Sequence, residues 1–123
     1  MHELSLASSI AEIAVRHAAG HRVKRITVQV GHLCQVVPDA LTFSFELVSA
    51  GTPLEGAALD LRAVPATGRC RRCAAVTTLR QFPLQCGACE GFDLEILTGE
   101  EFLVESLEVE EDDIGHFDRA AVG

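Results

Sequence analysis

The sequence contains no tryptophan and no tyrosine, and six phenylalanines are its only large aromatic residues. A surface for stacking the bases of single-stranded nucleic acid is therefore mostly absent. Positive charge is also scarce, because ten Lys and Arg residues face eighteen Asp and Glu residues, for a formal net charge of -8. Binding to phosphate requires clustered Lys and Arg, so we expect neither nucleic acid nor an anionic membrane surface as a partner.

The chain also lacks a long apolar run. No stretch approaches the ~20 apolar residues that cross a bilayer. Glu3, Glu12 and Arg16 interrupt the first twenty residues, which therefore lack the apolar core of a signal peptide. We expect a cytoplasmic protein whose thiols stay reduced. In that compartment, five cysteines are better explained as metal ligands than as disulfides.

The negative charge comes from one segment. Residues 100 to 113 carry eight acidic side chains and no basic one, whereas the rest of the chain has ten of each sign. Two interpretations remain open: a solvated acidic strand and tail that favours solubility, or a surface for a partner with a basic face. The residues after 111 are expected to form a poorly ordered end.

Hydrophobic periodicity predicts two helices, over residues 3 to 19 and 38 to 50. Gly20 is a suitable end for the first helix and Gly51 for the second. Pro38 suits the first turn of the second helix, where its missing N–H would have no partner. The apolar residues expected on the inner faces are Leu4, Ala7, Ile10, Ala11, Ala14, Val15 and Ala18 in the first helix and Leu41, Phe43, Phe45, Leu47 and Val48 in the second.

Alternating apolar and polar residues predict strands over residues 22 to 30 and 57 to 64, and a segment rich in Phe, Leu and Val predicts another over 101 to 110. Pro65 and Gly68 break the pattern after the second strand and mark a linker. If the last strand returns to the sheet of the first two, the cysteine-rich region between them is an insertion. The economical arrangement is an α+β fold with a small mixed three-stranded sheet and two helices.

This reading divides the chain into two domains. Residues 1–65 together with 98–123 form the α+β domain, and residues 66–97 form the inserted module. A module of this size is too small to hold a hydrophobic core of its own, so we expect a metal ion to stabilise it. Bending at the linker would let the module move relative to the other domain, and such mobility is also compatible with a domain-swapped homodimer.

Cys70, Cys73, Cys86 and Cys89 form two pairs with a gap of two residues each. This gap lets a tight turn direct two thiolates at one ion, and two facing turns give the tetrahedral sulfur site that zinc prefers. Iron and two disulfides are weaker alternatives, and a redox dithiol needs one pair rather than two. Four thiolates leave no open position for a catalytic water, so the predicted Zn2+ is structural.

Several arginines lie close to the cysteines, namely Arg69, Arg71, Arg72 and Arg80. They could form a nucleic-acid patch of the kind found in zinc-ribbon modules. A four-thiolate zinc centre carries a formal charge of -2, however, and three acids lie nearby. We therefore expect the arginines to balance the thiolates. A zinc-ribbon module for binding protein or nucleic acid remains the alternative function, and no catalytic pair of residues indicates an enzyme.

Met1 and His2 begin the chain with an unusual set of donors. The amine of Met1, the amide nitrogen of His2 and its imidazole can close two small rings around one ion. Such nitrogen-rich sets favour square-planar Ni(II) or Cu(II) over tetrahedral zinc. The residues alone leave a second interpretation open, in which His2 is an ordinary surface side chain.

Several short motifs occur here in one order: Met1-His2-Glu3-Leu4-Ser5, the loop from Gly31 to Val37, Leu41-Thr42-Phe43-Ser44-Phe45-Glu46, Gly51-Thr52, and the paired cysteines. In this combination the chain resembles the HypA/HybF family of nickel metallochaperones, which serve the maturation of [NiFe]-hydrogenase. The resemblance covers the whole chain except about the last ten residues.

The resemblance implies a non-enzymatic carrier that binds Ni2+ at its N-terminus. It implies Met1 and His2 as nickel ligands, with Glu3 as a further ligand or a tuner of affinity, and the four cysteines as ligands of structural zinc. It also implies a HypB-type GTPase and the [NiFe]-hydrogenase large subunit as partners. Some relatives also serve urease.

The chain departs from the family pattern in one loop. His32 stands where many relatives have an acidic residue, and Cys34 is an additional thiol. A loop histidine and a small buried cysteine are the simpler interpretations, although either side chain could touch a metal. The fourth nickel ligand stays open among the Glu3 amide, His17, His21, His32, His116 and water.

Overall fold

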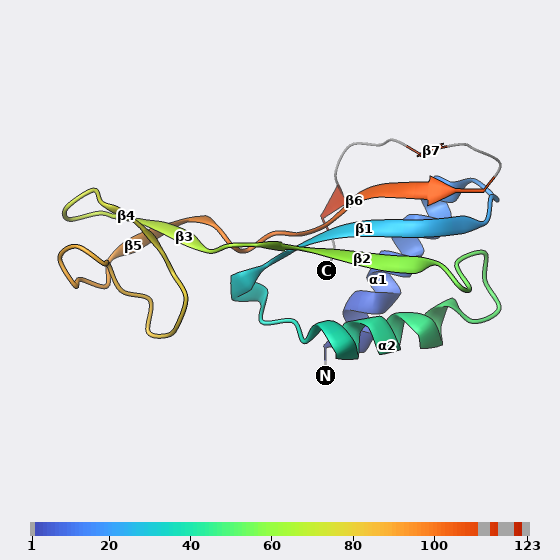
Figure 1. The fold of residues 1–123 in the computed structure, drawn as a ribbon, viewed down its shortest axis with the longest axis horizontal. Helices are drawn as coiled ribbons and strands as arrows, with labels where there is room; N and C mark the ends of the chain where they lie inside the picture. The colour runs from blue at the N-terminus through green and yellow to red at the C-terminus, as the bar shows by residue number, and fades with distance from the viewer. Residues whose placement is uncertain (1, 111–113, 116–119, 122–123) are drawn as a thin grey trace. The chain divides into compact units, whose positions relative to one another are not determined.

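The computed structural model describes residues 2–110, 114–115 and 120–121 (Figure 1). The chain divides into two compact units. The first takes in Met1–Gln29, Val36–Arg62 and Phe102–Gly123, and the second takes in Val30–Gln35 and Ala63–Glu101. The second unit therefore holds more of the chain than the stretch 66–97 that the sequence assigns to the zinc module.

The elements, in chain order, are α1 (Glu3–Ala18), β1 (Val23–Gly31), the short 3-10 helix η1 (His32–Cys34), α2 (Pro38–Ser49), β2 (Ala58–Val64), β3 (Thr67–Cys70), β4 (Val76–Thr78), β5 (Leu94–Thr98), β6 (Phe102–Val109), β7 (Ile114–Gly115) and β8 (Ala120–Ala121). The two helices and three longer strands predicted from periodicity are confirmed, with ends displaced by one residue or less. No described helix is long and apolar enough to cross a membrane.

The larger sheet has the order β2-β1-β6, with two short additions at β6. The last long strand thus joins the sheet of the first two, as predicted. Figure 1 shows β1 and β2 running in one direction and β6 in the other, so the sheet is mixed. β7 and β8 each pair antiparallel with β6. The poorly ordered end predicted after residue 111 lies mostly outside the described residues, but its two described segments are these short strands.

The core of the first unit forms where α1 packs against α2 and β6. Full burial of an Ile, Leu or Phe side chain contributes about 1.5–3 kcal/mol to the free energy of unfolding. The burial of these side chains is therefore the main contribution to the stability of this unit. The largest fully buried residues of this unit are Ile10, Ile26, Val28, Leu41, Leu54, Val104 and Leu107, with Phe45 nearly so.

The predicted helix faces need correction. On α2 the buried residues are Leu41, Phe45 and Ser49, which are spaced by four. Phe43 and Leu47, expected on the same face, are 61% and 58% exposed. Each helix buries only the stripe that touches a neighbour, and residues two positions from Phe45 point to the opposite side.

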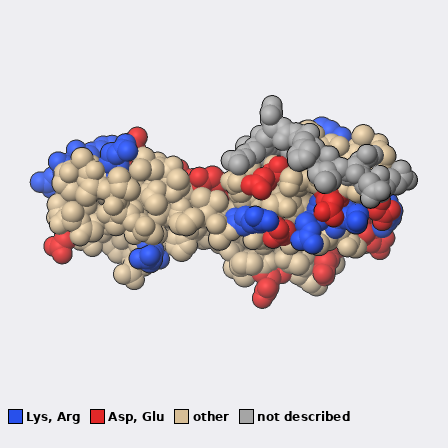
Figure 2. All heavy atoms as spheres, turned by 45° about the horizontal axis from the view of Figure 1, so that its top comes forward, with Lys and Arg blue, Asp and Glu red and all other residues tan. Residues whose placement is uncertain are grey.

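Basic side chains at the start of β1 and just before it partly neutralise the acidic side chains at the end of β6 and just after it. Lys24 pairs with Glu108 and Arg22 with Glu110, each with 3.9 Å between nitrogen and oxygen. Figure 2 shows acidic and basic side chains beside one another over the first unit. The acidic segment is therefore not a uniformly negative surface where it is described.

The second unit contains an antiparallel sheet with the order β4-β3-β5. The segment predicted as a free linker is part of this unit. Thr67 begins β3, and its hydroxyl lies 2.7 Å from that of Thr98, which also bonds the Pro65 carbonyl at 2.8 Å. Of the segment predicted as a linker, Thr67 and Gly68 therefore belong to β3, and residues 65 and 66 lie between β2 and β3.

Residues 31–33 approach the segment between β5 and β6 very closely. The N–H of Gly31 donates to the carbonyl of Glu101 at 2.6 Å, and that of Leu33 donates to the carbonyl of Gly99 at 2.8 Å. A Cβ on Gly31 would overlap the carbonyl of Gly99, so only glycine fits here.

Candidate metal centres

The four cysteines predicted to bind zinc lie together in the second unit. Their sulfur atoms are all within 4.8 Å of one another. The sulfurs of Cys70 and Cys89 are 3.6 Å apart, and so are those of Cys73 and Cys86. Four sulfurs at about 2.3 Å from a central zinc would stand about 3.8 Å apart, so the cluster matches a tetrahedral thiolate site.

The first cysteine of each pair accepts backbone hydrogen bonds within its own turn. Cys70 Sγ accepts from Arg72 N and Cys73 N at 3.4 and 3.5 Å. Cys86 Sγ accepts from Ala88 N and Cys89 N at 3.3 and 3.4 Å. These N–H groups stabilise negative charge on sulfur, as a metal-bound thiolate requires.

Both turns close in the same way. The N–H of Ala74 donates to the Cys70 carbonyl at 2.9 Å, and that of Glu90 donates to the Cys86 carbonyl at 3.1 Å. Ala74 and Glu90 both adopt left-handed backbone, with φ of 67° and 63°. Two non-glycine residues in this unfavourable region, at equivalent positions, show that the two turns have the same local fold.

The pKa values of the sulfurs differ strongly. The N–H groups of Cys73 and Arg72 lower the pKa of Cys70, and those of Cys89 and Ala88 lower the pKa of Cys86 to about 6. Although the N–H of Ala75 lowers the pKa of Cys73, its contacts with Cys86 and the other thiols raise it to about 11. Four crowded thiols ionise together only beside a positive ion, so the donor set fits a divalent metal.

The arginines near this cluster pair with carboxylates instead of the thiolates. Arg71 Nη1 lies 2.8 Å from Asp93, and Arg69 Nη1 lies 3.8 Å from Glu95. The expectation that they balance the thiolates is therefore corrected for these two residues. Arg72 has no ion pair within the described part of the chain.

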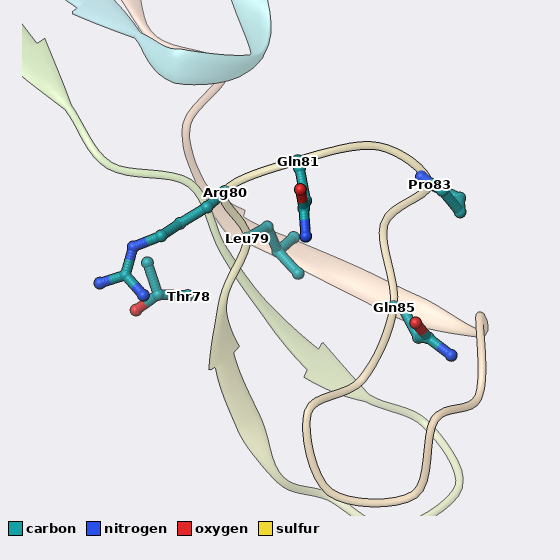
Figure 3. Close-up of a pocket in the computed structure, with 6 residues that line it drawn as sticks. All are labelled: Thr78, Leu79, Arg80, Gln81, Pro83 and Gln85. Atoms are coloured by element: carbon teal, nitrogen blue, oxygen red, sulfur yellow. The ribbon is translucent and has the colours of Figure 1, made fainter.

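A surface cavity of about 260 Å³ lies beside the loop that joins the two cysteine pairs (Figure 3). Its lining residues are Thr78, Leu79, Arg80, Gln81, Pro83 and Gln85. Figure 3 shows the Arg80 side chain extending toward Thr78, away from Gln85. None of these residue types is a usual zinc ligand, so the cavity is not part of the sulfur cluster.

The predicted nickel ligands fall at the start of α1. Met1 lies outside the described residues. His2 is exposed, and its carbonyl accepts the first helical hydrogen bond, from Leu6 N at 2.9 Å. Glu3 is buried, although the sequence pattern gives no sign of this, and its carboxylate accepts a bond from Val37 N at 3.4 Å. The amino-terminal ammonium, first, and this N–H, second, lower the pKa of Glu3 to about 2.

The other candidate ligands are spread along the chain. His17 lies in the last turn of α1, His21 follows that helix, and His32 begins η1. His116 lies outside the described residues. Cys34, half-buried in the second unit, donates to the carbonyls of Glu100 and Glu101 and is not a member of the sulfur cluster. Burial raises its pKa.

Comparison with known protein families assigns both units of the chain to one family. The family model described as "Hydrogenase/urease nickel incorporation, metallochaperone, hypA" matches residues 1–109. The chain belongs to the HypA family. The predicted resemblance is therefore confirmed, and since HypA proteins are metallochaperones, the chain is not an enzyme.

Two curated HypA proteins illustrate the similarity. The hydrogenase maturation factor HypA of Geotalea uraniireducens (strain Rf4) is 44% identical over 110 residues, which cover 89% of this chain and all of that protein. HypA of Nostoc sp. (strain PCC 7120) is 40% identical over 111 residues, which cover 90% of this chain and 97% of that protein.

The fold is also that of HypA. The solution structure of the Ni metallochaperone HypA from Helicobacter pylori matches with a TM-score of 0.63 and 24% identity, covering 89% of this chain and 97% of the other. A second HypA solution structure matches with a TM-score of 0.64. The α+β fold with two helices and a four-cysteine module is thus confirmed.

Proposed function

We propose that this chain carries Ni(II) at its N-terminus, through Met1, His2 and Glu3, for insertion into the large subunit of [NiFe]-hydrogenase. Membership of the HypA family over residues 1–109 carries the proposal. Its relatives named hydrogenase maturation factor, and the H. pylori relative named a Ni metallochaperone, support the choice of metal and of client. A HypB-type GTPase is the proposed working partner.

The position of His2 before the first turn of α1 suits the proposed chelate. Backbone N–H groups at the start of a helix have no partner within the helix. A metal can therefore use the amide nitrogen of His2 without breaking a helical hydrogen bond. The imidazole is exposed, so an acceptor protein can reach the ion and exchange ligands with it.

The four cysteines are the proposed site of one structural zinc ion. Zinc bound there would hold the two cysteine turns of the second unit together. It would supply no catalytic chemistry, since four thiolates fill its coordination shell. Cys70 and Cys86 are almost fully buried, at 1% and 2% exposure, whereas Cys73 and Cys89 are exposed. The proposed roles of the two metals are thus separate: one stabilises and the other is cargo.

The decisive experiment is a Ni(II) titration of untagged, zinc-loaded protein by calorimetry and absorption spectroscopy. We expect a planar, nitrogen-rich Ni(II) spectrum and at least about a hundredfold loss of affinity in His2→Ala. Ser8→Ala, at an exposed position of α1 that is not a candidate ligand, is the control and should bind as the parent does. One glycine added before Met1 should weaken binding as His2→Ala does, because it displaces the amine. Equal affinity of His2→Ala and the parent would refute the N-terminal site.

A further inference from the structure

The first unit contains a cavity of about 340 Å³ at the C-terminal end of α2, beside the loop that leads to β2. Figure 1 shows this loop turning back beside the end of the helix. The residues that line the cavity are Phe45, Glu46, Ser49, Ala50, Leu54, Glu55, Gly56 and Ala57. They include two carboxylates and no basic side chain, so the cavity favours a positively charged ligand.

Two further features strengthen this preference. Ser49 is 2% exposed, and its hydroxyl has no hydrogen-bond partner among the residues that the structure describes. A buried hydroxyl without a partner is costly, and a ligand with N–H donors would satisfy it. The last carbonyls of α2 also carry the negative end of the helix dipole, which stabilises a cation.

The carboxylates are available to a ligand. Glu46 is exposed and makes no hydrogen bond or ion pair within the described part of the chain. Glu55 is also exposed and accepts only one long bond in the described structure, from Gly51 N at 3.4 Å. Arg22 Nη2 donates to the backbone carbonyl of Glu55 at 2.9 Å, and its Nε lies 3.9 Å from Glu110, but Arg22 is not among the residues that line the cavity.

The floor of the cavity is apolar. Phe45 and Leu54, which directly precede the two carboxylates in the sequence, are buried there, at 2% and 0% exposure. A ligand that fits must therefore combine an aliphatic stem with a cationic head. A guanidinium group matches best, because its planar fork carries five N–H donors for two carboxylates and a hydroxyl, whereas an ammonium group carries three.

An apolar strip adjoins the cavity on the outer side of α2, formed by Phe43 and Leu47. Their exposure, 61% and 58%, is unusual for side chains of this size on adjacent turns. Glu46 is three residues after Phe43 and Ala50 is three after Leu47, so these pairs are neighbours on the helix surface. Glu46 and Ala50 also line the cavity, so the strip and the cavity adjoin. Figure 1 shows α2 at the outer edge of the first unit, where a partner can reach it.

We propose that this cavity binds an arginine side chain presented by an apolar segment of a partner protein. The guanidinium group contacts Glu46, Glu55 and the Ser49 hydroxyl, and its stem packs on Phe45 and Leu54. Phe43 and Leu47 contact apolar residues that flank the arginine. The proposal does not involve either metal centre, so its test is independent of the test of the nickel proposal.

The test of the cavity is an NMR titration of the full, zinc-loaded chain with N-butylguanidinium at constant ionic strength. We expect saturable shifts of the backbone amides of residues 46–57. Glu46→Gln and Glu55→Gln should each weaken binding by about three- to tenfold. Asp39→Asn removes the same charge about two turns away on the same helix and should change nothing. Shifts elsewhere in the chain, or an affinity in both glutamine variants equal to that of the parent, would refute the cavity.

The test of the partner uses a capped Leu-Arg-Leu peptide and its counterpart with citrulline, the neutral isostere of arginine. We expect the arginine peptide to bind at least about tenfold more tightly. Phe43→Ala combined with Leu47→Ala should weaken the peptide but leave N-butylguanidinium binding unchanged. Equal binding of the two peptides would overturn the proposal. So would tighter binding of Mg2+ than of guanidinium at these amides, since the site would then be a metal site.

Discussion

The carboxylate of Glu3 accepts a hydrogen bond from the backbone N–H of Val37, with 3.4 Å between the two atoms. Glu3 lies in the first turn of α1 and Val37 immediately precedes α2, so the contact joins the starts of the two helices. The residue is buried, at 6% exposure. A residue proposed to tune nickel affinity therefore also has a structural role in the first unit.

This relationship predicts that Glu3 variants separate into two classes of stability. Glu3→Ala removes the acceptor and leaves the Val37 N–H without it, so we expect thermal unfolding of the first unit about 5 °C lower. Glu3→Gln retains a carbonyl oxygen and should lose less than half as much. Circular dichroism at pH 7 measures both. Glu12→Ala, an exposed position on the same helix, is the control, and equal losses in all three variants would contradict the prediction.

Removal of zinc should unfold one unit selectively. With a chelator, or in Cys86→Ser, we expect the amide signals of β3, β4 and β5 to collapse while those of α1 and α2 remain, because the short sheet has few buried apolar side chains. Zinc content and two-dimensional NMR report the two effects. Cys34→Ser should keep one zinc per chain, since its sulfur lies outside the cluster. A simultaneous loss of the helices would show that the first unit depends on the metal.

Local patterns in the sequence were enough to place the helices and the long strands. α2 begins at Pro38 and ends before Gly51, as predicted, because proline fixes the first turn and glycine stops the last. The sulfur cluster could also be predicted from the sequence, since the spacing of Cys70, Cys73, Cys86 and Cys89 determines the geometry of the turns.

Tertiary contacts could not be predicted from the same patterns. Periodicity places Phe43 and Leu47 on an apolar stripe but does not show which part of the stripe meets α1. Nor does it show that a charged residue, Glu3, occupies a buried position of α1. The pairing of Gly31 with Glu101 joins residues that are 70 positions apart, so no local signal marks it. The cavity beside Ser49 depends on a loop whose course the sequence does not determine.

The unsatisfied hydroxyl of Ser49 predicts a stabilising substitution. Ser49→Ala removes a buried polar atom without a described partner and improves helix propensity, so we expect about 1 kcal/mol more stability in urea unfolding. Ser44→Ala on the same helix makes the same chemical change at a half-buried position and should gain about 0.5 kcal/mol or less. A loss of stability in Ser49→Ala would mean that the hydroxyl has a partner in solution, such as a bound water.

The close approach at Gly31 predicts a strongly destabilising substitution. The backbone of Gly31 has φ of -74°, which alanine adopts readily, so Gly31→Ala tests space alone. Its new Cβ would overlap the Gly99 carbonyl and lie 2.7 Å from the N–H of Glu101, so the paired backbones must separate. We expect a loss of about 3 kcal/mol, with faster amide exchange at Gly31 and Leu33. Gly20→Ala is the control: φ is +89° there but no atom lies within 4 Å, so strain alone should cost about 1 kcal/mol. A smaller loss at Gly31 than at Gly20 would show that the two backbones separate easily.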